Sequence, residues 1–144
     1  MKLDPNLTGM DNLQAMIDDR GGQAPLHKAL SIRLVEVGDG WAVFQGQPDE
    51  SHYNPQGTVH GGWISAILDS ALGCAVHTRL DAGKGYTTLE LKVNMVRAVS
   101  AATGVVSARG DVVHLGRRTA TSEAKLVDAN GRLLAHASCT CLIL

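Results

Sequence analysis

The sequence predicts an α+β domain in which an antiparallel β-sheet packs against one long helix. One stretch, residues 60–78, is apolar on nearly every side of a helix and carries a single carboxylate, Asp69. Segments with the alternating pattern of β-strands surround it, two before and four after. Consecutive strands joined by short turns form antiparallel sheets, so these observations favour one sheet layer covered by one helix.

The size and composition of the chain fit a single globular domain. Its 144 residues predict one domain over residues 1–144, with residues 1–25 as an N-terminal helical extension. A net charge of −1 and an aromatic content of 3% disfavour nucleic acid as a partner. Residues 63–76 are too short an apolar run to span a bilayer, so no membrane partner is expected. Three cysteines and an N-terminus without an apolar signal region predict a cytoplasmic protein.

The elements before the long helix can be placed from periodicity and turn residues. Apolar positions spaced three or four apart predict a short amphipathic helix over residues 7–17. Residues 29–37 alternate as a strand, residues 38–40 carry the Gly-Asp-Gly signal of a hairpin turn, and residues 41–47 form the partner strand. Residues 48–58 are polar and contain proline and glycine, which predicts a loop leading into the helix at 60–78.

The second half of the chain predicts strands only. Alternating or Val- and Ala-rich segments cover residues 87–96, 102–113, 118–127 and 133–144. Residues 128–131, Asp-Ala-Asn-Gly, form a turn between the last two strands. The expected order is therefore helix, two strands, long helix and four strands.

Small residues form a stripe along the long helix. The stripe is spaced by three or four positions, which places its members on one face: Gly62, Ala66, Asp69, Gly73 and His77. Two interpretations fit this pattern. The small residues fit beneath the sheet of the same chain, or they allow a second copy of the helix to approach closely.

The start of the long helix offers a site for a negatively charged oxygen. Free backbone N–H groups at a helix start favour negative charge, and Gly61 and Gly62 lie at this start. Asp69 lies eight residues beyond Gly61, among small and apolar neighbours. An oxyanion site beside a carboxylate indicates acid–base or nucleophilic chemistry.

The spacing of these two residues separates them within one chain. Eight helical residues correspond to about 12 Å along the axis, a distance that an aspartate side chain does not cover. If Asp69 and Gly61 belong to one site, that site is shared between two chains. An antiparallel two-fold pairing of the helix would bring Asp69 of one chain to Gly61 of the other.

The loop and the helix start together form the motif Asn54-Pro55-x-Gly57-x-x-His60-Gly61-Gly62, followed by Asp69. This motif resembles that of a known family, the hotdog-fold acyl-CoA thioesterases of the PaaI type (phenylacetyl- and 4-hydroxybenzoyl-CoA thioesterase-like). The resemblance runs from about residue 26 to the C-terminus. Residues 91–98, 114–118 and 128–135 are also similar to that family.

This resemblance implies a hotdog fold, in which an antiparallel sheet wraps around one long central helix, and a thioester hydrolase activity. It implies that subunits pair through a continuous sheet into a homodimer, and that dimers often pair again into a homotetramer. The substrate would be an acyl-CoA, hydrolysed to a free carboxylic acid and coenzyme A. No separate cofactor is implied, because coenzyme A is part of the substrate.

The family's site residues carry over by motif position. The resemblance implies that the Gly61 amide donates a hydrogen bond to the oxyanion. It also implies that Asp69 of the partner subunit is the nucleophile or the general base. Asn54 would orient the thioester or water, and His60 would brace the loop and contact the carbonyl. Thr88 would hold the attacking water. Substrate contacts are implied for a second set: Gly62, Thr87 as the alternative hydroxyl, Gly116, Arg117 and Arg118.

Several alternatives remain open from the sequence. Asp69 is explained by a structural hydrogen bond as well as by catalysis, and Arg117 and Arg118 are explained as solvated charges at a strand end. A non-catalytic acyl-CoA-binding regulator on the same fold would have no need for Asp69. The histidines and cysteines lack metal-ligand spacing, so no metal site is expected. The acyl group, and coenzyme A as opposed to acyl carrier protein, stay undetermined.

Overall fold

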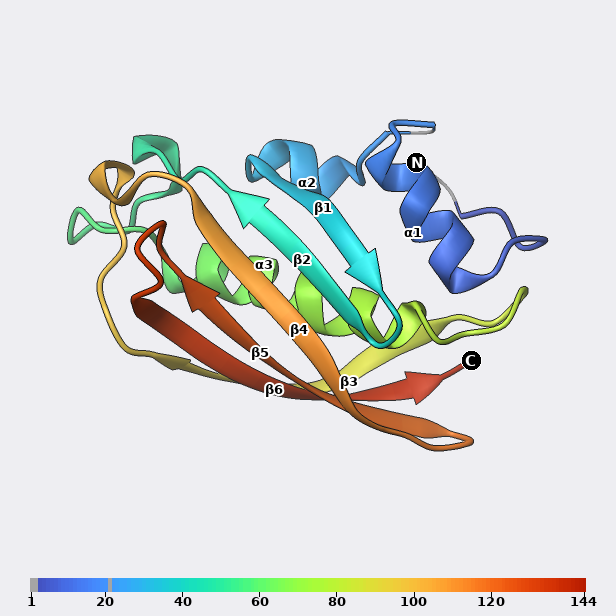
Figure 1. Cartoon of the computed structure of the whole chain (residues 1–144). Helices are drawn as coiled ribbons and strands as arrows, with labels where there is room; N and C mark the ends of the chain where they lie inside the picture. The colour runs from blue at the N-terminus through green and yellow to red at the C-terminus, as the bar shows by residue number, and fades with distance from the viewer. Residues whose placement is uncertain (1–2, 21) are drawn as a thin grey trace.

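The computed structural model describes residues 3–20 and 22–144. In this part of the chain a six-stranded sheet curls around one long helix, and two short helices lie beside the first strands (Figure 1). The helices and strands are α1 (Gly9–Ile17), α2 (Pro25–Ala29), β1 (Ile32–Gly38), β2 (Trp41–Gly46), α3 (Gly61–His77), β3 (Tyr86–Met95), β4 (Val106–Leu115), β5 (Thr119–Val127) and β6 (Leu133–Ile143).

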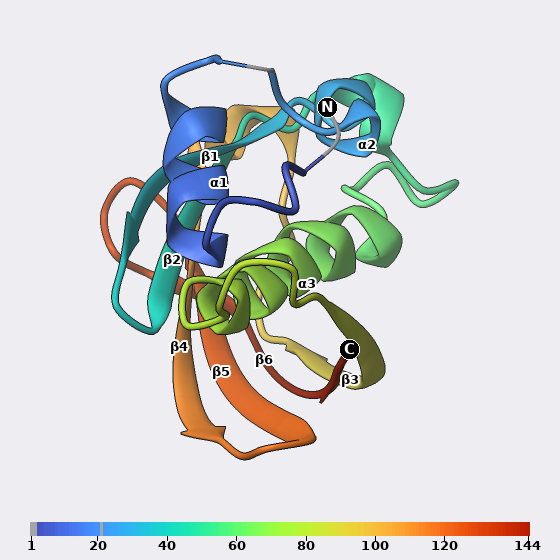
Figure 2. The ribbon, with the colours of Figure 1, turned by 90° about the vertical axis from the view of Figure 1, so that its right-hand side faces the viewer.

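The sheet has the order β1-β2-β4-β5-β6-β3, and neighbouring strands are antiparallel. The strand that follows α3 therefore lies at one edge, paired only with β6, while the first hairpin forms the opposite edge. Figure 2 shows the sheet bending below α3, which leaves one flank of the helix outside the sheet. The predicted α+β architecture, with an antiparallel sheet around a long helix, is confirmed.

The core forms where α3 meets the sheet. Because most sides of α3 are apolar, the helix buries most of its surface, including Ile67, Leu68, Leu72 and Val76. The helix backbone approaches β4 closely at Gly110, where a Cβ atom would collide with the backbone carbonyl of Ala71. Tight packing of this kind holds α3, and every side chain on it, in a fixed orientation to the sheet.

Part of the small-residue stripe serves packing within one chain. The ring of Tyr86, from β3, occupies the space where a side chain at Gly73 would lie. His77 is buried against the same ring, with ring centroids 5.7 Å apart. Gly62 is exposed and Ala66 is half-buried. At the C-terminal end of the stripe, the small residues therefore fit against the sheet of the same chain. At its N-terminal end, Gly62 and Ala66 remain accessible to a second copy of the chain.

The structure differs from the expected elements in three places. Helix α2 was not predicted, because five residues are too few to show a helical period, although Pro25 stands at the favoured first position. The fourth strand begins at Val106 instead of residue 102. Residues Ala101–Thr103 form a 3₁₀ turn, and Gly104 follows with φ +74°, which interrupts the extended backbone.

The first strand, expected from residue 29, begins only at Ile32, because Ala29 ends α2 and Ser31 has φ +53°. The other element bounds agree closely with the expectations. Helix α1 begins at Gly9 because Thr8 caps it: its hydroxyl accepts a hydrogen bond from the Asp11 amide. Across the described residues, no helix has the length and apolar character needed to cross a membrane.

Candidate active site

The loop before α3 is organised by Asn54. Its side-chain oxygen accepts hydrogen bonds from the amides of Gln56 (3.0 Å) and Thr58 (3.2 Å), and its amide nitrogen donates to the Thr58 hydroxyl (3.1 Å). Asparagine is well suited to such a turn because its short side chain mimics a backbone group. The structure therefore shows Asn54 holding the loop that leads to the helix start.

His60 is the N-cap of α3. Its Nδ1 atom accepts a hydrogen bond from the Gly62 amide (2.8 Å), and its own amide donates to the His52 carbonyl (2.8 Å). An accepting Nδ1 carries no proton, so the neutral ring holds its proton on Nε2. The imidazole is exposed, which leaves that N–H available to a ligand at the helix start.

The helix start leaves one backbone donor available. The Gly62 amide is bonded to the His60 ring, and the Trp63 amide donates to the His60 carbonyl (2.9 Å). The Gly61 amide has no hydrogen-bond acceptor among the described residues. Because it lies at the positive end of the α3 dipole, this N–H is a suitable donor to a developing oxyanion.

Asp69 is held by a residue of the edge strand. The Thr88 hydroxyl donates to Oδ1 of Asp69 at 3.0 Å, and both side chains are half-buried. This bond leaves Oδ2 of the carboxylate without a protein partner among the described residues. The neighbouring Thr87 is exposed and does not contact Asp69. Of the two hydroxyls considered from the sequence, Thr88 is the one that the fold brings to the carboxylate.

A β-bulge lies next to this contact. The pairing of β3 with β6 shifts between Thr88 and Glu90, so Leu89 is the extra residue and is 58% exposed. A bulge changes the direction of the side chains that follow it. It allows Thr88 and then Leu91, three residues later, to lie on the inner side of the strand, where both are half-buried. Sequence alternation alone did not reveal this bulge.

The Cys74 thiol and the Tyr86 phenol, both near Asp69, are poor nucleophiles because burial keeps them protonated. Burial raises the pKa of the Cys74 thiol to about 12 and holds the pKa of Tyr86 well above its ordinary value. Cys139 and Cys141 are buried side by side on β6, with their sulfur atoms 3.7 Å apart, as their alternation predicts. The hydrogen bond with Cys141 lowers the pKa of the Cys139 thiol to about 7, but Cys139 is 2% exposed, whereas the carboxylate of Asp69 is only half-buried and is the more accessible group for attack or proton transfer.

The two parts of the predicted site lie at different ends of β3. Gly61 packs against Met95 at the end of the strand: a Cβ at position 61 would lie 2.7 Å from the Met95 methyl. Asp69 contacts Thr88, near the beginning of the strand. Within one chain the structure does not bring Gly61 and Asp69 together, as the helical spacing predicts.

The remaining predicted substrate contacts lie on the β4–β5 turn. Arg117 and Arg118 are exposed, and neither forms an ion pair within the part of the chain that the structure describes. The turn is bonded to the end of β6, where the Ile143 amide donates to the Arg118 carbonyl (2.9 Å). The two guanidinium groups are therefore free to bind an anion, and they lie at the end of the sheet where β3 begins.

The fold and this helix-start geometry define a class of protein, the hotdog-type thioesterases. The thioesterase superfamily model matches residues 56–135, and the chain belongs to that family. The predicted enzyme class, a thioester hydrolase of PaaI-like type, is confirmed at the level of the family.

The chain is similar to several characterised proteins. It is 28% identical to a 1,4-dihydroxy-2-naphthoyl-CoA hydrolase of Listeria monocytogenes over 80% of this chain and 92% of the other. A structure of a variant of the phenylacetic acid degradation protein PaaI from Thermus thermophilus is 33% identical, with a TM-score of 0.75 over 83% of this chain and 98% of the other. The E. coli PaaI structure, 18% identical over 95% of this chain and 96% of the other, shares the fold with a TM-score of 0.81.

Proposed function

We propose that this protein is an acyl-CoA thioesterase that hydrolyses a coenzyme A thioester to a carboxylic acid and free coenzyme A. The observation that carries the proposal is that α3 bears both a free Gly61 amide at its start and a carboxylate, Asp69, that is oriented by Thr88 of β3. Membership in the thioesterase superfamily and similarity to a CoA-thioester hydrolase support it.

The Gly61 amide and the Asp69 carboxylate have different roles in the proposed reaction. The Gly61 N–H donates to the thioester oxygen as negative charge develops on it, a contribution typically of about 3–4 kcal/mol. Asp69 acts in one of two ways. As a base it takes a proton from water while the water oxygen bonds to the carbonyl carbon; as a nucleophile it bonds to that carbon itself and water then hydrolyses the anhydride. In both routes the C–S bond breaks and coenzyme A leaves as its thiolate.

The proposed site is shared between two subunits. Strand β3 is an edge strand, paired only with β6, and its exposed apolar side chains include Leu89 and Met95. A long edge strand of this kind pairs readily with another strand. Antiparallel pairing of β3 with β3 of a second copy would bring Asp69 of one subunit to the Gly61 end of the other. We therefore propose a homodimer as the active unit, and we propose that Arg117 and Arg118, which are exposed, bind the coenzyme's phosphates.

The second candidate is an acyl-CoA-binding regulator that does not turn its ligand over. The Thr88–Asp69 bond favours the enzyme, because a binding protein has no need for an oriented carboxylate with a free oxygen. The discriminating experiment is a panel of aryl-, arylacetyl- and medium-chain acyl-CoAs assayed for thiol release, with one matched acyl carrier protein thioester. Tight binding without hydrolysis of any of them would favour the regulator and contradict the proposal.

Removing the Thr88 hydroxyl is expected to lower the turnover number about 10-fold or more. Replacement by valine keeps the shape of the side chain and deletes the donor to Asp69, and hydrogen bonds to charged groups contribute about 1.5–3 kcal/mol. Thr88→Ser, which keeps the hydroxyl, is the matched control and should retain most of the activity. If Thr88→Val and Thr88→Ser have equal turnover numbers, the Thr88 hydroxyl has no role in the reaction.

Mixing two inactive variants tests whether the site is shared. An Asp69→Asn chain and a Gly61→Pro chain each lack one half of the site. In a heterodimer of the two, one site carries both defects and the other carries none. After unfolding and refolding a 1:1 mixture, about a quarter of the wild-type activity should return, assuming random pairing. If activity stays at the level of the separate variants while heterodimers form, each site lies within one chain.

A further inference from the structure

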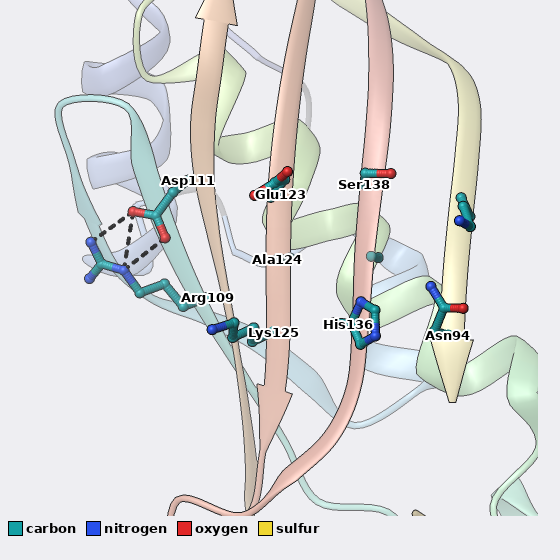
Figure 3. A pocket seen from close by; sticks show the side chains of 10 residues that line it. Asn94, Arg109, Asp111, Glu123, Ala124, Lys125, His136 and Ser138 are labelled. Carbon is teal, nitrogen blue, oxygen red and sulfur yellow. Dashed lines mark hydrogen bonds and ion pairs between the residues drawn. The ribbon is translucent and has the colours of Figure 1, made fainter. Parts of the chain in front are cut away.

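The two faces of the sheet carry polar side chains of different kinds. On the face that points away from α3, charged and polar side chains surround a shallow hollow of about 470 Å³, and Glu123 of β5 and Ser138 of β6 are among them (Figure 3). Successive side chains of a strand alternate between its faces, so the neighbouring Ser122 and Cys139 point towards α3. Cys141, two positions beyond Cys139, lies on this inner face as well. All three inner side chains are at most 2% exposed, and the proposed chemistry does not use them.

Cys141 lies next to the residue that holds Asp69. In the pairing of β3 with β6, Cys141 is directly opposite Thr88, and the two side chains are hydrogen-bonded. The Thr88 hydroxyl gives its one proton to Oδ1 of Asp69 (3.0 Å), so its oxygen is left to accept. The hydrogen bond with Cys139 and burial raise the pKa of the Cys141 thiol. The thiol therefore keeps its proton and is a donor, although a weak one, to the Thr88 oxygen.

The contacts of Cys141 continue through β5 and return to α3. Its sulfur lies 3.7 Å from the sulfur of Cys139, which in turn lies 3.2 Å from the Ser122 hydroxyl oxygen. That hydroxyl donates to the backbone carbonyl of Leu72 (3.2 Å). Leu72 follows Asp69 by three residues, which is less than one turn of the helix. A buried chain of contacts thus leaves α3 at Asp69, crosses β3, β6 and β5, and ends on the same turn of α3.

The place of Thr88 on its strand explains why such support matters. Strand β3 is an edge strand, paired only with β6, and its regular pairing stops at Thr88, where the bulge at Leu89 follows. A threonine side chain has three staggered χ1 rotamers, and they direct the hydroxyl differently. A second hydrogen bond to the same hydroxyl stabilises the rotamer that directs it at Asp69.

We propose that Cys141 is a positioning residue for the thioesterase reaction, because its thiol holds the Thr88 hydroxyl in the orientation that fixes Asp69. Cys139 and Ser122 anchor this thiol to α3. The role rests on the proposed function, in which Asp69 is the reacting carboxylate. The competing explanation is packing alone, since buried cysteines often act as small apolar side chains. Packing does not depend on the Thr88 hydroxyl, whereas positioning acts only through it.

A double-mutant cycle separates these two explanations. Cys141→Val replaces the thiol by an apolar group of similar size, and we expect the turnover number to fall about 2- to 5-fold, as for the loss of one weak hydrogen bond. KM should be unchanged, because the buried thiol does not touch the substrate. In a Thr88→Val background the same substitution should have no further effect, since the hydroxyl that it orients is absent. Cys141→Ser keeps a donor and should retain the wild-type turnover number.

A matched control and a second measurement complete the test. Cys74→Val changes another buried thiol, one that is hydrogen-bonded to Tyr86, so its effect on turnover should be the same with and without the Thr88 hydroxyl. The orientation of Thr88 is also measurable without substrate. Three-bond NMR couplings to its methyl carbon should report a single χ1 rotamer in the wild type and averaging between rotamers in Cys141→Val.

The outcomes decide between positioning and packing. An equal loss of turnover in both backgrounds overturns the inference, as does wild-type turnover in a folded Cys141→Val variant. Circular dichroism melting shows whether the valine variant is folded, and Cys141→Ala takes its place if it is not. If the wild type releases no thiol from any acyl-CoA, the proposed function fails, and the couplings alone then decide this inference. Couplings of Thr88 that are unchanged by the Cys141 substitution contradict it in either case.

Discussion

Replacing Asp69 by asparagine is expected to lower the turnover number for acyl-CoA hydrolysis by about 100-fold or more, because the amide neither accepts the water proton nor attacks the thioester. The substitution is nearly isosteric, and its side-chain oxygen still accepts the Thr88 hydroxyl bond of 3.0 Å. The local packing of α3 should therefore be unchanged. Steady-state measurement of thiol release gives the effect on turnover.

A control and a binding measurement complete this test. Asp81→Asn removes one carboxylate from an exposed position beyond the end of α3 and should leave turnover unchanged. The Asp69→Asn variant should still bind a non-hydrolysable acyl-CoA thioether with nearly wild-type affinity. Wild-type turnover in Asp69→Asn would show that the carboxylate has only a structural role.

The two possible roles of Asp69, nucleophile and base, differ in whether a covalent intermediate forms on the enzyme. Attack by the carboxylate forms a mixed anhydride that adds the mass of the acyl group to the chain, whereas base catalysis forms no covalent intermediate. Mass spectrometry after rapid quenching during the first turnover distinguishes the two.

The long helix could be predicted almost to the residue, because its signals are local. The apolar period and the capping residues are contiguous in the sequence, and the expected range of 60–78 compares with Gly61–His77 in the structure. Strands also follow from local alternation. The separation between Asp69 and Gly61 within one chain could be predicted from the rise per residue of a helix alone.

The features that escaped sequence reasoning depend on pairing between distant segments. The position of β3 beside β6, at the edge of the sheet, follows from tertiary packing and not from any local pattern. The choice of Thr88 over Thr87 required the register and the bulge at Leu89. Asp111 and Glu123 lie directly opposite each other only because β4 and β5 pair, and no local pattern in the sequence indicates this contact.

Gly61→Pro is expected to lower the turnover number by about 100- to 1000-fold, the usual effect of losing one oxyanion donor. Proline suits the first position of a helix because the missing N–H has no partner within the helix. The preceding residue, His60, has φ −61° and ψ 138°, in the extended region that a following proline favours. The substitution therefore removes the proposed donor from a helix start that otherwise accommodates it.

The matched variant Gly61→Ala isolates the role of the N–H. Both substitutions add a Cβ, which would lie 2.7 Å from the methyl group of Met95, and this half-exposed, flexible side chain can move aside. Alanine keeps the amide hydrogen, so it should lose far less activity than proline. If the two variants lose activity equally, crowding against Met95 explains the effect and the Gly61 amide does not bind the oxyanion. A loss confined to proline identifies the backbone N–H itself as the group that stabilises the transition state, since no side-chain atom is removed in either variant.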